Sequence, residues 1–186
     1  MLNSKVDPFN NRIQRAIPNL TVHDAVGAIE FYKKLFDAKV KMIANYNGKI
    51  AHSEVIIANT SFFISDEIYG DKSAKTIGSS PVSFYIYVAN VDEIFNKALQ
   101  LGAKVVQPIS DMFYGDRIGS FIDQFGFTWM VASHIKEVSQ EESNKGLQQM
   151  MKQMEQTHQM QQSGGANDTY KNKYLKYKKK YQDLRN

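Results

Sequence analysis

The middle of the chain alternates between strand-like and helix-like spacing of apolar residues. Residues 17–22 predict a strand, after which Asp24 can cap a helix with apolar residues at helical spacing: Val26, Ile29, Phe31, Leu35 and Phe36. Three further strands are predicted at 39–44, 50–58 and 61–65, separated by Asn-Gly and Asn-Thr turns. The first unit of the chain therefore has the order βαβββ.

The same order of elements then returns. A strand rich in Tyr, Phe and Val is predicted at 82–88, followed by a helix at 91–101 that Asn90 caps and Gly102 ends. Three more strands complete the unit, at 104–107, 118–123 and 128–133.

The two units can be aligned as an internal repeat. Val22 matches Val88 at an offset of 66, and Ile64 matches Met130 at the same offset. The pattern predicts an α+β fold of two tandem βαβββ modules, module one at 16–66 and module two at 82–136. We expect the modules to form a curved, cup-like mixed sheet with the helices outside, because each sheet must bury one face.

The ends of the chain differ in composition from the 16–136 domain. Residues 1–15 are a polar lead-in, and 137–165 form a Gln/Met-rich segment, helical or mobile, that opens with the capping-box sequence Ser139-Gln140-Glu141-Glu142. Residues 166–186 are a Lys/Tyr-rich amphipathic tail. The two alternatives for 137–165 stay open at this point.

Charge and composition narrow the function classes. The absence of Cys excludes disulfides, zinc–thiolate sites and thiol nucleophiles. The net charge of +4 comes from the tail, because residues 167–186 hold seven Lys or Arg and two Asp, which leaves the rest of the chain at −1. The start of the chain lacks the apolar stretch of a signal peptide, and no apolar run is long enough to span a membrane, so we expect a cytoplasmic protein.

Several sequence blocks carry a family resemblance. These are IPNLTVHDAVGAIEFYKKLFDAKV, GKIAHSEVIIANTSFFISDE, PVSFYIYVANVDEIFNKALQLGAKVVQP and YGDRIGSFIDQFGFTW. They resemble the vicinal oxygen chelate superfamily, in the PhnB-like branch of the glyoxalase/bleomycin-resistance/dioxygenase group. The resemblance implies a cup often completed in a homodimer, a divalent metal held by the first and last strands of each module, and glyoxalase-like lyase or dioxygenase activity in some members and drug binding in others.

The family's metal positions map onto four residues of this chain that fit a metal poorly. They are Ile17 and Ile64 in module one, and Ser83 and Met130 in module two. A divalent cation of this class prefers imidazole nitrogen or carboxylate oxygen. We therefore expect no cofactor at these positions, although a metal bound elsewhere in the cup stays an alternative.

Two groups of residues are candidates for chemistry or ligand binding. His52 and Glu54 lie two apart on a predicted strand and so share a face, as an acid/base pair or the start of a rebuilt metal site would. Around the last hairpin, Arg117 can bind a carboxylate or phosphate with Asp116 orienting it. The aromatic residues nearby can line a pocket: Phe113, Tyr114 and Trp129. Core packing and a local Asp–Arg turn are the alternative interpretations.

The tail has a pattern of its own. Tyr170, Tyr174, Tyr177 and Tyr181 follow a helical spacing flanked by Lys. This segment resembles the tails of many proteins of giant amoeba-infecting viruses, which would imply a viral protein in host cytoplasm. A protein, RNA and a membrane surface are its alternative partners.

These observations favour a glyoxalase-like protein of PhnB type that binds a small organic or anionic ligand in its cup without the usual metal. The alternatives are a metal-dependent glyoxalase or dioxygenase with relocated ligands, and an interaction protein that acts through its tail. The scaffold alone does not decide between them.

Overall fold

The computed structural model describes residues 16–162, and the side chains through residue 156. Residues 1–15 and the tail at 166–186 lie outside this part, so the interpretations of both segments stay predictions. Module one consists of five elements: β1 Asn19–Val22, α1 Ala25–Phe36, β2 Lys39–Tyr46, β3 Lys49–Ile57 and β4 Thr60–Asp66.

Module two repeats the order of module one. Its elements are β5 Ser83–Tyr87, α3 Val91–Gln100, β6 Lys104–Asp111, β7 Asp116–Ile122 and β8 Thr128–His134. A short helix that the sequence pattern did not predict, α2 Ala74–Ile77, lies in the connection between the modules, and α4 Gln140–Gln162 follows module two. The predicted βαβββ order is therefore confirmed in both modules.

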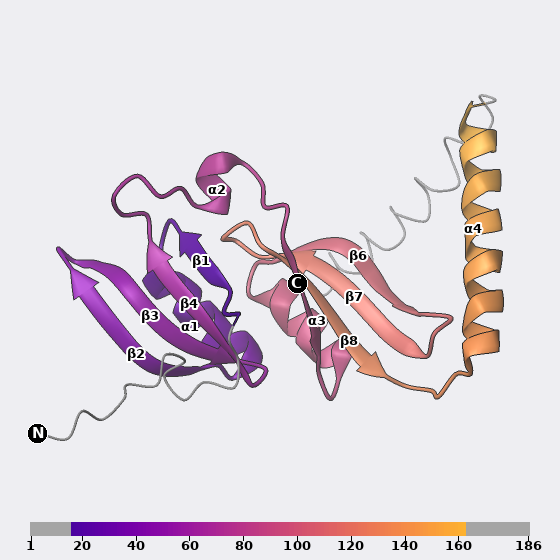
Figure 1. Ribbon diagram of the computed structural model, residues 1–186, viewed down its shortest axis with the longest axis horizontal. Helices are drawn as coiled ribbons and strands as arrows, with labels where there is room; N and C mark the ends of the chain where they lie inside the picture. Colours follow the sequence, from indigo (N-terminus) through magenta and orange to yellow (C-terminus); the bar gives the residue numbers. More distant parts are fainter. Residues whose placement is uncertain (1–15, 163–186) are drawn as a thin grey trace, which may run out of the picture.

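Each module forms its own four-stranded mixed sheet. The strand orders are β1-β4-β3-β2 and β5-β8-β7-β6, with the first and last strand of each module paired in parallel. The two sheets lie side by side along the molecule (Figure 1). The predicted α+β fold is thus confirmed, with two neighbouring sheets in the place of the single one expected.

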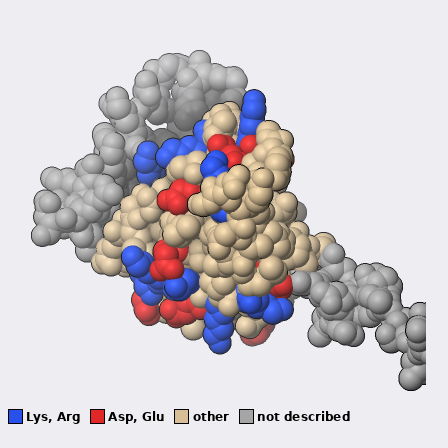
Figure 2. All heavy atoms as spheres, turned by 90° about the vertical axis from the view of Figure 1, so that its left-hand side faces the viewer, with Lys and Arg blue, Asp and Glu red and all other residues tan. Residues whose placement is uncertain are grey.

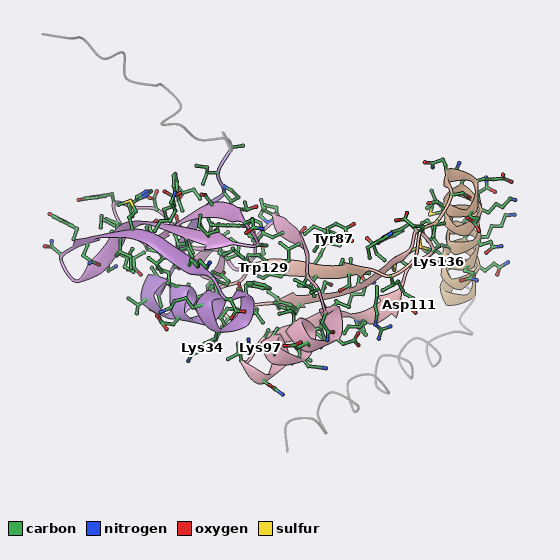
Figure 3. The ribbon with its side chains drawn as sticks, turned by 90° about the horizontal axis from the view of Figure 1, so that it is seen from below. Lys34, Tyr87, Lys97, Asp111, Trp129 and Lys136 are labelled. Carbon is green, nitrogen blue, oxygen red and sulfur yellow. The ribbon has the colours of Figure 1, made fainter. Side chains whose placement is uncertain are left out.

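Helices α1 and α3 pack on the same side of the two sheets. Figure 3 shows both helices below the strands with Lys34 and Lys97 beside them, whereas Tyr87 projects from the opposite side. We call the sheet surfaces opposite α1 and α3 the open face. Because strand residues alternate between faces, every second residue of β5, β7 and β8 belongs to it.

The core is continuous between the modules and rich in aromatic rings. Trp129 of β8 is fully buried, and its ring centroid lies 5.3 Å from that of Tyr32 and 4.9 Å from that of Phe36, both in α1. Phe62 of β4 and Phe84 of β5 pack against the same indole. Helix α1 of module one is therefore joined through its aromatic rings to strand β8 of module two.

A buried carboxylate joins the same elements by hydrogen bonds. Asp123, in the β7–β8 connection, accepts hydrogen bonds from the Tyr32 hydroxyl and the Trp129 indole, each at 2.8 Å. Its other oxygen accepts from the backbone N–H groups of Phe125 and Phe127, each at 2.9 Å. Burial raises the pKa of Asp123, although these hydrogen bonds oppose the increase.

The helix starts follow the sequence signals. Asp24 and Asn90 cap α1 and α3 by accepting hydrogen bonds from Gly27 N and Glu93 N. The predicted capping box before α4 is present, since the Glu142 carboxylate accepts from Ser139 N and Ser139 Oγ accepts from Glu142 N. Within the 137–165 segment, residues 140–162 are therefore helical.

Candidate functional site

The open face of module two has an apolar middle and a polar end. Strand alternation assigns eleven residues to it: Ser83, Tyr85, Tyr87, Asp116, Ile118, Ser120, Ile122, Thr128, Met130, Ala132 and His134. The residues between them point to the helix side, where Phe84, Phe121, Trp129 and Val131 join the core. The polar groups gather where β5 and β8 end and β7 begins.

Asp116 is the centre of this polar end. It is 3% exposed, and its Oδ2 accepts hydrogen bonds from the hydroxyls of Tyr87, at 2.7 Å, and Tyr85, at 3.3 Å. Its Oδ1 lies 2.8 Å from His134 Nδ1, whose Nε2 lies 3.4 Å from the exposed Glu137 carboxylate. We call Tyr85, Tyr87, Asp116 and His134 the Asp116 cluster.

The backbone of the β6–β7 turn brings Asp116 to its place. Gly115 has a φ of 93°, and a Cβ atom there would lie 1.9 Å from the carbonyl oxygen of Lys136. The Gly115 carbonyl oxygen accepts hydrogen bonds from Ile135 N and Lys136 N. The turn is thereby held against the segment after β8, which keeps Asp116 beside His134.

The ionisation of the cluster follows from its contacts. Burial opposes the charge on Asp116, but hydrogen bonds from Tyr87, His134 and Tyr85 outweigh it and lower the pKa of Asp116 below 3.8. The hydrogen bond to Asp116 raises the pKa of His134 above 6.5.

The two tyrosines are held in the neutral form. Burial raises the pKa of Tyr85, and the hydrogen bond to Asp116 raises that of Tyr87. At neutral pH the cluster therefore presents a carboxylate with two phenols that donate to it.

Asp116 does not orient Arg117, contrary to the sequence-based prediction. The two residues are neighbours on β7, so their side chains point to opposite faces of the sheet. Arg117 lies on the helix side, where Nε and Nη2 donate to the Asp92 carboxylate of α3 at 2.8 and 2.9 Å, and Nη1 donates to Asp111. These ion pairs, on the far side of the sheet from Asp116, already use the guanidinium group that was expected to bind an anion.

The three aromatic residues predicted to line a pocket also lie in different parts of the molecule. Trp129 is fully buried in the core between the modules and does not line the open face. Phe113 and Tyr114 lie in the β6–β7 turn with ring centroids 5.1 Å apart. Phe113 is packed against α4 at Gly146, where a Cβ atom would approach to 2.5 Å, while Tyr114 is near enough to the cluster to raise the pKa of Tyr85.

His52 and Glu54 share the open face of module one but contact different groups. The His52 ring packs against Phe63, with 4.6 Å between the ring centroids. Glu54 is 4% exposed, and its Oε1 accepts hydrogen bonds from Ser61 Oγ at 2.8 Å and Lys41 Nζ at 3.1 Å. The pair thus forms a second polar region on the open face.

The four positions mapped from the family's metal site do not all face the cup. Ser83 and Met130 lie on the open face of module two, and Ile17 precedes β1. Ile64, however, is fully buried in the core. The strand pairs Asn19–Phe63 and Tyr85–Met130 correspond, so the structural counterpart of Met130 is Phe63, at an offset of 67.

The physical reason for this shift is a difference in strand connections. Residues 58–59 join β3 to β4, whereas the longer stretch 123–127 joins β7 to β8. The corrected set is Ile17, Phe63, Ser83 and Met130, whose side chains do not supply the nitrogen and carboxylate ligands that a divalent cation of this family prefers. In the part of the chain that the structure describes, no three His, Asp or Glu side chains are grouped to hold a metal ion.

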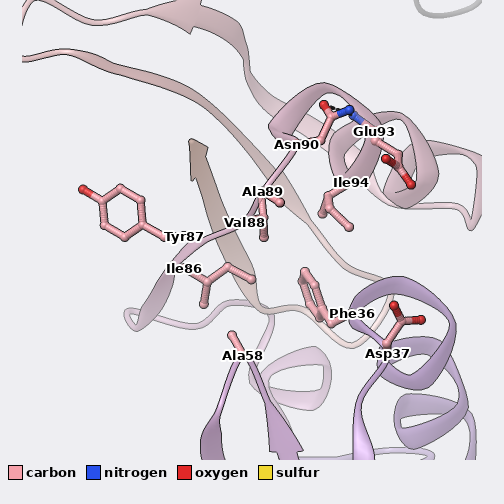
Figure 4. A pocket seen from close by; sticks show the side chains of 10 residues that line it. All are labelled: Phe36, Asp37, Ala58, Ile86, Tyr87, Val88, Ala89, Asn90, Glu93 and Ile94. Carbon is pink, nitrogen blue, oxygen red and sulfur yellow. Dashed lines mark hydrogen bonds between the residues drawn. The ribbon is translucent and has the colours of Figure 1, made fainter. Parts of the chain in front are cut away.

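A separate cavity of about 290 Å³ lies at the junction of the modules (Figure 4). Phe36, Ile86 and Ile94 form its apolar part, and the carboxylates of Asp37 and Glu93 stand at its edge. Tyr87 also borders it, but its ring points away toward the open face. Strand β5 therefore separates this cavity from the Asp116 cluster.

The surface of module one has no block of a single charge sign in the view of Figure 2. Lys and Arg side chains alternate there with Asp and Glu around a broad uncharged area. Within residues 16–162, no helix has both the length and the apolar composition that crossing a membrane requires.

Sequence reasoning missed three of the four residues of the cluster. Tyr85 and Tyr87 alternate along a strand, which is a weak signal for a shared face, and a histidine at the end of a strand, as His134 is, gives no signal for a buried partner. Its side chain is 47% exposed, yet it pairs with Asp116. The register Asp116–His134 in the last hairpin was the signal that could have joined them.

Comparison with known proteins identifies the family to which this fold belongs. Residues 12–131 match the family model of the Glyoxalase/Bleomycin resistance protein/Dioxygenase superfamily. An uncharacterised protein of Mycobacterium bovis is 35% identical over 131 residues, which cover 67% of this chain and 86% of that protein.

Solved structures of similar proteins share the fold. A gene product of Arabidopsis thaliana has a TM-score of 0.54 at 27% identity, covering 65% of this chain and 99% of that one. A PhnB protein from Bacillus cereus has a TM-score of 0.54 at 19% identity, covering 64% of this chain and 99% of that one. With its two βαβββ modules and this match, the chain belongs to the glyoxalase/bleomycin resistance protein/dioxygenase superfamily.

Proposed function

We propose that this protein binds a small organic molecule on its open face without the help of a metal ion. The observation that carries the proposal is the Asp116 cluster, in which a buried carboxylate holds two half-exposed tyrosines in place. Binding sites of this kind combine apolar surface with a few oriented polar groups. Met130, the strand partner of Tyr85, supplies partly exposed apolar surface next to the cluster.

The anionic ligand that the sequence also allowed has less support. Its basis was Arg117, which lies on the helix side and is paired with Asp92 and Asp111. The proposal is therefore restricted to an organic molecule that contacts the Tyr85 and Tyr87 rings.

The test is a ligand screen by thermal shift on protein stripped of metal with a chelator. We expect compounds that raise the melting temperature of the stripped protein and lose this effect in Tyr85→Leu/Tyr87→Leu. Tyr46→Leu, which removes a half-exposed tyrosine from β2 in module one, is the matched control and should keep the effect. Stabilisation that appears only after a divalent metal is added back would contradict the proposal.

The enzymatic alternative rests on a relocated site at His52 and Glu54. Lys41 and Ser61 already occupy one oxygen of the Glu54 carboxylate, so a metal there would have to displace them. Elemental analysis of the purified protein separates the two functions. A stoichiometric divalent metal that His52→Ala removes would favour the enzyme.

We also propose that a second copy of the chain covers part of the open face. Every residue of β2 is exposed, and its large apolar residues are Val40, Met42, Ile43 and Tyr46. Light scattering after size exclusion should give the mass of a dimer, and Met42→Glu, at the strand partner of Glu54 on the open face, should lower it. A monomeric mass for the unchanged chain would contradict this arrangement.

A further inference from the structure

The orientation of the two phenols determines which ligands the Asp116 cluster can accept. The hydroxyl hydrogens of Tyr85 and Tyr87 are directed to Asp116 Oδ2, so their oxygens offer only lone pairs to a ligand on the open face. A ligand acceptor such as a carboxylate would have to compete with Asp116 for these hydrogens. A ligand donor finds the oxygens already oriented.

The rings of the same residues add a second attraction. Tyr85 is 42% exposed and Tyr87 60% exposed, and their ring centroids lie 5.4 Å apart with the planes at 53°. Two tilted rings form two walls of a partial cage, and the negative face of a phenol ring attracts a cation. The Asp116 carboxylate behind the hydroxyls adds a negative charge.

From this geometry we propose that the ligand of the Asp116 cluster is an organic cation, such as a quaternary or protonated amine, seated against Tyr85 and Tyr87. The inference rests on the proposed function and specifies the chemical class of its ligand. Its charged group would lie over the two rings, and its apolar part over the partly exposed Met130.

The charged groups around the site predict how pH changes the affinity. They are Asp116 on β7, His134 on β8 and Glu137 after β8, with Tyr114 from the β6–β7 turn as a further titratable neighbour. Protonated His134 repels a cation, so affinity should increase as the pH rises and the imidazole loses its charge. Two unit charges about 6 Å apart in water repel by enough to change an affinity about threefold, which sets the size of the expected effect.

The test compares three probes of nearly the same shape: choline, its neutral isostere 3,3-dimethylbutan-1-ol, and the anion 3,3-dimethylbutanoate. Binding is followed through the NMR signal of the methyl groups of each probe, and the ring resonances of Tyr85 and Tyr87 locate it on the unchanged chain. We expect choline to bind about tenfold more tightly than the neutral isostere, as a cation–π contact predicts. Tyr85→Leu/Tyr87→Leu should abolish this preference, and Tyr46→Leu should retain it.

Two further variants separate the contributions of charge. Asp116→Asn should reduce the preference for choline, and His134→Gln should remove the increase in affinity between pH 5.5 and 8.5. Because both tyrosines are partly exposed, the leucine variants keep the test valid if Asp116→Asn fails to fold.

The outcomes distinguish the inference from the function on which it rests. Equal or tighter binding of the neutral or anionic probe at Tyr85 and Tyr87 would overturn the cation inference and leave metal-free ligand binding intact. Failure of all three probes would also overturn it, while the proposed function would still be decided by the library screen on the stripped protein.

Discussion

The two modules share a fold but hold their open-face carboxylates in opposite ways. In module one, Glu54 is held by a lysine whose side chain is 55% exposed, together with a serine hydroxyl. In module two, Asp116 is held by two phenols and an imidazole. A lysine neutralises a carboxylate, whereas phenols leave its charge in place and lock their own orientation. Module two is therefore the half of the molecule in which we propose that a ligand binds.

A second difference concerns the helix starts. In module one, Asp66 accepts hydrogen bonds from Ala25 N of α1 and Ile50 N of β3. In module two, Ser133 is the counterpart, accepting from Val91 N of α3 and donating to the Val88 carbonyl. In both modules a residue of the last strand anchors the start of the helix. This residue is Asp66 in module one and Ser133 in module two.

The largest effect is expected where the modules meet. Asp123→Ala should lower the free energy of unfolding by about 3 kcal/mol or more, since it leaves four donors without their acceptor, two of them in the aromatic core. Chemical denaturation measures this loss. Asp111→Ala, at an exposed carboxylate paired with Arg117, is the control and should cost below about 1 kcal/mol. Similar losses for the two variants would contradict the buried-acceptor interpretation.

Removing the helix anchor of each module, Asp66 or Ser133, compares how much each module depends on it. Asp66→Ala should cost about 2 to 3 kcal/mol, because two buried N–H groups lose a charged acceptor, whereas Ser133→Ala should cost about 1 kcal/mol. Thermal unfolding of both variants under identical conditions gives the difference. If Ser133→Ala proved the more damaging, module two would depend on its anchor more than its contacts suggest.

A smaller effect should separate the tyrosines of the two open faces. Tyr87→Phe removes the 2.7 Å hydrogen bond to Asp116 and should cost about 1 kcal/mol. Tyr46→Phe in module one should be close to neutral, since no hydrogen bond joins its hydroxyl to the described residues. Equal stability of the two variants in urea would indicate that hydrogen bonds to water compensate for the loss of the Tyr87–Asp116 hydrogen bond.

The smallest effect should appear as a pH dependence. The pKa of His134 is raised from 6.5, so the stability that it contributes is complete below pH 6.5 and is lost as the pH rises through its folded-state value. The pKa of Asp116 is lowered from 3.8, so its contribution is present above pH 3.8 and is lost as the pH falls further. An NMR titration of His134 should give a raised pKa that Asp116→Asn returns toward 6.5. An unchanged titration in that variant would show that Asp116 is not the cause.

Much of the fold could be predicted because its signals are local. Asp24, Asn90 and Ser139 cap helices by contacts within the next three residues, and strand alternation is visible in the sequence. The site was harder to predict from the sequence because its contacts join residues that are far apart in the chain, such as Tyr87 and Asp116. Ile64 was assigned to the cup because a constant repeat offset assumes that corresponding connections have the same length. The β7–β8 connection is in fact longer than the β3–β4 connection.

The bond between Tyr32 and Asp123 has a consequence for the order in which the chain folds. It closes a loop between residues 91 positions apart, so it can form only after nearly all of both modules is available. During synthesis α1 can form early, but Phe36 and Tyr32 have no indole to pack against until Trp129 is made. Until then the aromatic side chains of α1 are exposed to solvent, which favours aggregation. The β7–β8 hairpin covers them when it folds.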